Sequence, residues 1–170
     1  MHPASLVRVE GPDRIAEPAR NIELTPQSAA GLAAKSLSVE EGSCGSIRAF
    51  TRTVMGHWGV TAGVESVVAV AWELAANAVQ HALKADAQLQ QPGCAWLLRR
   101  GKAVACAATD ASPAPPRLGP PDPMDSNRRG LHLVDRISSH SGWSNSPSGT
   151  KTVWARVLTT WCTSLGLAGR

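Results

Sequence analysis

Three polar side chains with the chemistry for acid–base work and cation binding lie at intervals of four in an otherwise apolar stretch. They are Glu73, Asn77 and His81, within the segment Trp72 to Ala82. Four residues turn an α-helix through about 400°, so these side chains form one polar ridge along a helix. A carboxylate accepts protons, and a carboxamide oxygen is a ligand that Mg²⁺ prefers. Burying such groups without partners is costly, so we expect the ridge to face a ligand. A solvated helix edge is the alternative interpretation.

A second candidate lies at the end of an apolar stretch of small residues, Val104 to Ala108. This stretch predicts a buried strand, which leads through Asp110 and Ser112 into Pro113. Asp110 is a candidate for binding a ligand that donates a hydrogen bond. The alternative is a turn, because Asp and Ser favour turns through local hydrogen bonds.

A third candidate is the segment Asn127 to Ile137, in which we predict that Gly130 opens a helix. Helix N-termini present unpaired N–H groups and bind phosphates. Arg129, Gly130 and Leu131 are therefore candidate anion contacts. A plain helix start on a basic surface is the alternative.

The order of these segments resembles that of the GHKL (Bergerat-fold) ATPases, and most of all the bacterial anti-sigma factor serine/threonine kinases. Glu-Leu-x-x-Asn-Ala-x-x-His-Ala, from Glu73 on, is similar to the N-box of that family. The resemblance covers about residues 36–158 and implies that Asn77 holds Mg²⁺ and that Glu73 is the base. It also implies that Asp110 accepts a hydrogen bond from the adenine amino group. The other nucleotide contacts that it implies are His81, Ser112, Arg129, Gly130, Leu131 and Thr150.

The sequence departs from the family pattern at Arg128, where the second glycine box has its first Gly. Two functions stay open for this reason. The first is an ATP- and Mg²⁺-dependent protein serine/threonine kinase that phosphorylates a small antagonist protein and sequesters a sigma factor. The second is a non-catalytic, nucleotide-gated protein-binding module, which the arginine favours and the intact Glu73 does not. A histidine autokinase or a gyrase-type ATPase needs a longer chain.

The segment between the second and third candidates, about 113–129, corresponds to the ATP lid of that family. Its prolines stand at 113, 115, 116, 120, 121 and 123. Proline fixes φ and removes a donor, so we expect neither helix nor central strand here. A solvated linker is the alternative.

Other patterns predict the elements that must position these residues. Gly45 to Trp58 has helical spacing and ends before Gly59, and Thr61 to Ala82 forms the ridge helix with Thr61 as its N-cap. A first short strand is expected around Leu37 and Val39. Strands flank a turn at 100–102, and a closing hairpin runs from Gly142 to Leu158, with Thr150 near its turn.

These elements predict an α/β fold of the α+β type: a two-layer sandwich with a mixed, mostly antiparallel sheet and helices on one face. The resemblance implies the Bergerat ATP-binding fold. The predicted organisation is an accessory or flexible leader at 1–33, an ATP-binding domain at 34–160 and a tail at 161–170.

The amino-acid composition limits the classes of partner that we expect for this protein. The 170 residues suffice for one domain with its own core, and the net charge of +4 comes without a basic stripe carrying interleaved aromatics. We therefore expect no direct nucleic-acid binding, and no apolar run suggests a membrane span. The four cysteines form no C-x-x-C pair, so we expect no zinc site. We expect a cytoplasmic protein, and in a reducing cytoplasm its cysteines should be thiols. The resemblance also implies a homodimer through the first helix region.

Overall fold

The computed structural model of the chain describes residues 7–8, 31–37, 43–84, 93–112, 114–116, 126–147 and 149–161. Within these ranges, only the backbone is described at 7–8, 43–44, 81–84, 126–129 and 161.

The described strands form two sheets. The larger has six strands in the order β1-β6-β7-β5-β4-β2, and every neighbouring pair is antiparallel except β1 with β6. A separate pair, β3 with β8, is antiparallel. The strands are β1 (Val7–Arg8), β2 (Leu32–Leu37), β3 (Val60–Ala62), β4 (Gly93–Arg100), β5 (Ala103–Asp110), β6 (His140–Asn145), β7 (Lys151–Leu158) and β8 (Thr160–Trp161).

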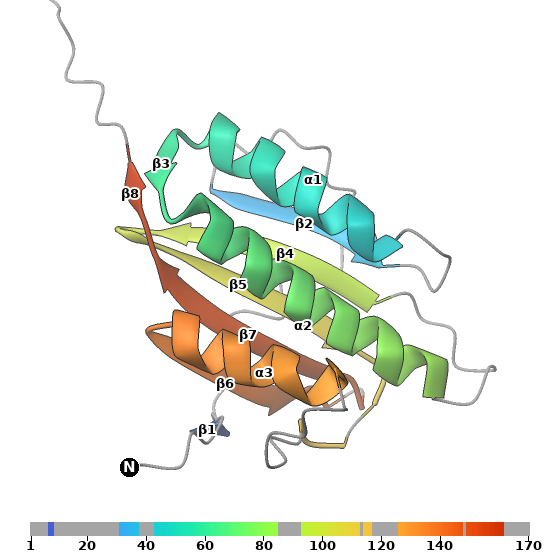
Figure 1. The fold of residues 1–170 in the computed structure, drawn as a ribbon. Coiled ribbons are helices and arrows are strands. Elements are labelled where there is room, and N and C mark those ends of the chain that lie inside the picture. Colours follow the sequence, from blue (N-terminus) through green and yellow to red (C-terminus); the bar gives the residue numbers. More distant parts are fainter. Residues whose placement is uncertain are drawn as a thin grey trace, which may run out of the picture.

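The described helices cover one face of the larger sheet (Figure 1). They are α1 (Ser43–His57), α2 (Val64–Lys84) and α3 (Ser126–Ile137). The central helix α2 packs on β4, β5 and β7, and α1 and α3 flank it. The core between the layers combines the apolar side of α2, including Leu74 and Ala78, with Ala108, Val153 and Ala155 of the sheet. The predicted two-layer α+β sandwich, with a mixed, mostly antiparallel sheet and helices on one face, is thus confirmed.

The two long helices follow the sequence prediction except where α2 begins. Helix α1 ends at His57, and Gly59 beyond it has a φ of 68°, as a helix-ending glycine should. The predicted N-cap Thr61 is wrong, because Thr61 lies in β3 and its hydroxyl donates to the Thr160 carbonyl of β8 at 3.3 Å. The first backbone acceptor of α2 is Gly63, whose carbonyl binds the Val67 N–H at 3.0 Å.

The two predicted hairpins are present. Strands β4 and β5 are joined at Gly101 and Lys102, and β6 and β7 are joined through a turn that contains Gly149. The first strand of the predicted domain lies earlier than expected, at Leu32–Leu37 instead of around Leu37 and Val39. Residues 38–40 lie outside the described residues.

Three described strands lie within or beside the predicted leader and tail. Strand β1 lies within the predicted leader, β2 begins two residues before the predicted boundary, and β8 ends at the first residue of the predicted tail. The rest of the leader up to residue 30 and the tail from 162 lie outside the described residues.

Among the described helices, none is long and apolar enough to cross a membrane. The described cysteines, Cys94 and Cys106, are free thiols on neighbouring strands, and they do not face each other in the β4–β5 register. Burial raises the pKa of the Cys106 thiol to about 12, so this thiol is inert at neutral pH.

Candidate functional site

Glu73 projects from the middle of α2 and is half-buried. Burial raises the pKa of its carboxyl above the ordinary value of 4.5, and the positive charge of Arg48 opposes this shift. The Arg48 guanidinium lies over the Trp72 ring, 4.5 Å from its centroid, which is a cation–π arrangement. A carboxylate whose pKa is raised is a stronger base than a solvated one, which suits it to accept a proton.

Gly130 of α3 lies directly against the Glu73 carboxylate. A Cβ added to Gly130 would overlap Oε2 of Glu73, and Cδ would be only 3.1 Å away. The absence of a side chain at Gly130 therefore gives the Glu73 carboxylate its position between α2 and α3. This contact joins two of the predicted site segments.

Asn77 lies one turn further along α2 and is half-buried. Its Nδ2 atom is buried and has no hydrogen-bond partner within the part of the chain that the structure describes. Buried polar groups are normally paired, and an exception requires an explanation. The Nδ2 atom is a hydrogen-bond donor, so a ligand that pairs with it would present an acceptor, such as a phosphate oxygen. His81 follows on the same helix, but its side chain lies outside the described residues.

The predicted opening of a helix at Gly130 is wrong, because α3 begins at Ser126. The last proline of the preceding segment is Pro123, so nothing in the sequence prevents helical backbone from residue 126 onward. For the same reason, the expectation of no helix up to residue 129 does not hold for 126–129. The unpaired N–H groups of this helix end belong to its first turn, and Gly130 lies one turn inside.

Of the two neighbours of Gly130 in the sequence, only Leu131 has a described side chain. The side chain of Leu131 is buried in the hydrophobic core. The side chains of Arg128 and Arg129 lie outside the described residues, although their backbone is part of the first turn of α3.

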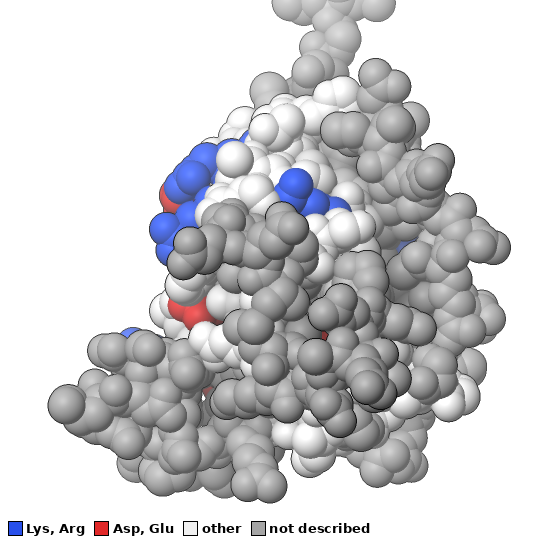
Figure 2. Space-filling model, turned by 90° about the vertical axis from the view of Figure 1, so that its right-hand side faces the viewer, with Lys and Arg blue, Asp and Glu red and all other residues white. Residues whose placement is uncertain are grey.

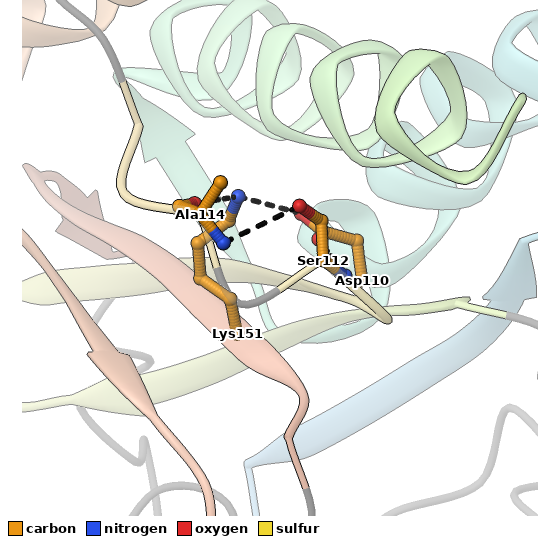
Figure 3. Close-up of polar contacts among 4 residues, drawn as sticks. All are labelled: Asp110, Ser112, Ala114 and Lys151. Atoms are coloured by element: carbon orange, nitrogen blue, oxygen red, sulfur yellow. Dashed lines mark hydrogen bonds and ion pairs between the residues drawn. The ribbon is translucent and has the colours of Figure 1, made fainter. Parts of the chain in front are cut away.

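Asp110 is buried at the end of β5, at 3% exposure. Its Oδ1 accepts the backbone N–H of Ser112 at 2.8 Å, and the Ser112 hydroxyl accepts the Ala114 N–H at 3.4 Å (Figure 3). These local bonds are those of a turn, as the alternative interpretation expected. A turn alone does not account for the burial of the carboxylate, which has a partner on another strand.

That partner is Lys151, which the sequence analysis missed. Lys151 opens β7 opposite Asp110, and its side chain is fully buried. Its Nζ lies 3.4 Å from Oδ2 of Asp110 and donates to the Ala114 carbonyl at 2.7 Å (Figure 3). The predicted residue, Thr150, is half-buried in the β6–β7 turn, one position before the strand. Strand alternation was the available signal, because Lys151, Val153 and Ala155 lie on the same side of β7.

The predicted lid segment at 113–129 is described only at 114–116 and in the first turn of α3. Arg117, a basic residue of this segment, lies outside the described residues. On the side of the molecule drawn in Figure 2, the visible Lys and Arg atoms gather mainly in two groups in the upper half. Acidic atoms lie beside the group at the left.

Comparison with known proteins relates the fold, but not the sequence, to a described protein. No protein-family model matches the chain, and a search of curated proteins found no match. The structure is similar to the crystal structure of the RsbU and RsbW domains of Rv1364c from Mycobacterium tuberculosis, with a TM-score of 0.56 and 15% sequence identity. The match covers 75% of this chain and 32% of the other. This similarity supports a GHKL-like fold.

Proposed function

We propose that this chain is an ATP-binding regulatory protein of the anti-sigma factor serine/threonine kinase type. The observation that carries the proposal is the group formed by Glu73, Asn77 and Gly130: a half-buried base, a buried amide nitrogen with no partner among the described residues, and a glycine that leaves room for the base. The fold of this chain is similar to that of a structure that contains an RsbW domain, and this similarity of fold is compatible with the proposal.

The residues fit a nucleotide with its magnesium ion. The side chain of Asn77 has an oxygen of the kind that Mg²⁺ prefers, and Asp110 offers a buried carboxylate that can accept from an adenine amino group. The ion would supply charge neutralisation at the phosphates, which together with positioning is most of what phosphoryl transfer requires. The further contacts we propose are His81, Ser112, Thr150 and the start of α3, including Arg129.

In the proposed phosphate transfer, one side chain of this chain, Glu73, acts on the substrate hydroxyl. Glu73 accepts the proton of the serine or threonine hydroxyl of the substrate protein, or orients that hydroxyl. Gly130, which has no side chain, leaves the space that the carboxylate occupies. The substrate class that we propose is a small antagonist protein, and a sigma factor is the partner of the second complex. We further propose that the protein is cytoplasmic and forms a homodimer.

Calorimetric titration with Mg²⁺ and ATP tests the nucleotide site. We expect wild type to bind ATP only with Mg²⁺ and the variant Asn77→Ala to lose that binding. The matched control is Asn145→Ala, which removes the same group from an exposed position on β6 and should bind as wild type does. Absence of binding to folded wild type would reject the proposal.

Transfer of labelled phosphate from ATP to a protein acceptor separates a kinase from the non-catalytic module. The variant Glu73→Gln should bind ATP normally and lose phosphate transfer. Arg128, which departs from the family pattern, favours the module. Binding of ATP by wild type with no transfer to any acceptor, and a partner affinity that changes with ATP, would establish the module instead.

A further inference from the structure

A buried lysine lies where the proposed site would recognise the base of its nucleotide. We propose that Lys151 is a positioning residue that keeps the Asp110 carboxylate ionised and correctly turned, so that the site selects a base with an amino group. This inference rests on the proposed function and adds to it a residue that determines specificity.

The strand register brings the two charges together. Asp110 ends β5, Lys151 begins β7, and the two residues are directly paired in the antiparallel ladder. Paired residues project to the same face of a sheet. Here this is the face covered by helices, because Ala108 and Val153, two positions further into each strand, belong to the core beneath α2.

Burial makes the pairing obligatory. The side chains of Lys151 and Asp110 are 0% and 1% exposed, and lysine is almost never buried to this degree without a partner. The ammonium group lies 3.4 Å from Oδ2 of Asp110 and donates a hydrogen bond to the Ala114 carbonyl at 2.7 Å. It therefore ties the end of β5 to the chain that follows the turn at Ser112.

Recognition of the nucleotide base depends on which groups of the base and of the protein donate hydrogen bonds. A carboxylate next to an ammonium group stays ionised, and an ionised carboxylate can only accept hydrogen bonds. Oδ1 of Asp110 accepts one from the backbone N–H of Ser112, and in the proposed complex the carboxylate accepts another from the base of the nucleotide. The adenine amino group is such a donor, whereas guanine presents a carbonyl oxygen at the same position of its ring.

A spectroscopic experiment on the wild-type protein tests this role. The ¹⁵N resonance of the Lys151 Nζ, assigned through its contact with Ala114, is followed during titration with Mg²⁺ and ATP and, separately, with inorganic tripolyphosphate. We expect ATP to shift the resonance and tripolyphosphate to leave it unchanged. A resonance that does not move while calorimetry shows saturation with ATP would overturn the role of Lys151 and leave the proposed function standing.

Competition between ATP and GTP gives the second readout. In Lys151→Met we expect the preference for ATP over GTP to fall by at least about tenfold, with unchanged affinity for tripolyphosphate. A merely structural role would weaken both nucleotides and tripolyphosphate alike. The matched control is Lys102→Met, at the exposed β4–β5 turn, which should keep the wild-type preference.

The possible results separate the two hypotheses. A variant Lys151→Met that keeps the wild-type preference contradicts this inference alone. If folded wild type binds neither ATP nor tripolyphosphate, the proposed function fails and this inference fails with it. If Lys151→Met does not fold, the wild-type resonance decides.

Discussion

The Glu73–Gly130 contact joins the helices α2 and α3, whereas the Asp110–Lys151 pair joins the strands β5 and β7, and the charged groups differ in burial and pairing. Glu73 is half-buried, its pKa is raised, and the neighbouring Asn77 has an amide nitrogen with no partner among the described residues. Asp110 and Lys151 are fully buried and bound to each other. The first region has unused hydrogen-bonding and proton-accepting capacity, and the second is already paired. Reactivity is expected from the first and fixed geometry from the second.

Removal of the buried ammonium should have the largest effect on stability. We expect Lys151→Met to lower the free energy of unfolding by about 3–5 kcal/mol, because the Asp110 carboxylate is left buried without its partner. Urea unfolding measures this, and the double variant Lys151→Met/Asp110→Asn should recover most of the loss. Lys102→Met should stay within about 0.5 kcal/mol of wild type. Equal urea midpoints for Lys151→Met and wild type would show that the pair does not stabilise the strand ends.

Gly130→Ala should damage the first region without unfolding it. The new Cβ would displace the end of the Glu73 side chain, which is flexible, so we expect a change of less than about 1 kcal/mol in the free energy of unfolding. Phosphate transfer should fall about 100-fold, because a small misplacement of a catalytic group is costly. Gly56→Ala in α1 is the control, since its Cβ would meet nothing within 4 Å. Full activity in Gly130→Ala would contradict the placement of Glu73 as the base.

The pH dependence of stability should distinguish two glutamates on the same helix. Burial favours the neutral form of Glu73, so the native state binds that proton more tightly than the unfolded state. Raising the pH above 4.5 should therefore destabilise wild type relative to Glu73→Gln, with no difference below that value. Thermal unfolding of wild type and Glu73→Gln at pH values below and above 4.5 checks the prediction.

Glu65 provides the control of opposite sign. The hydrogen bond from Arg52 lowers the pKa of Glu65, so raising the pH through its lowered pKa should stabilise wild type relative to Glu65→Gln. The same sign for both glutamates would contradict the assigned environment of Glu73.

The smallest effect is expected for Arg52→Gln. Arg52 donates to Glu65 from Nε at 3.0 Å and from Nη2 at 2.8 Å, but the pair is exposed. Water and salt screen such pairs, so any loss of stability should disappear as the ionic strength rises. Thermal unfolding at low and high salt measures this, and a loss that persists in high salt would show that the pair contributes more than charge.

The sequence predicted the helices and hairpins because their signals are local. Apolar spacing located α1 and α2, and the glycines at 59 and 101 lie where a helix ends and where a hairpin turns. The errors arose mainly where the local structure depends on a segment that is distant in the sequence. Thr61 could not be recognised as a strand residue without its partner β8, and the start of α3 was placed at a conspicuous glycine instead of after the last proline.

The same reasoning explains what was found and missed in the candidate site. Glu73 and Asn77 are one turn apart on a single helix, so their neighbourhood is visible in the sequence. The contact of Glu73 with Gly130 and the pairing of Asp110 with Lys151 depend on how α3 and β7 pack. Thr150 was chosen from the family resemblance, and Lys151 was not considered because a lysine normally indicates a solvated surface.

The pairing of β5 with β7 also bears on the order in which the molecule folds. Strands β4 and β5 are joined by a two-residue turn, so their contacts are close in sequence and cost little chain entropy to form. Asp110 and Lys151 are separated by the proline-rich segment, α3 and β6. Contacts that close such long loops form slowly. We therefore expect the hairpin to be able to form before the ion pair does, so a newly made chain can expose the carboxylate of Asp110 to water until β7 docks.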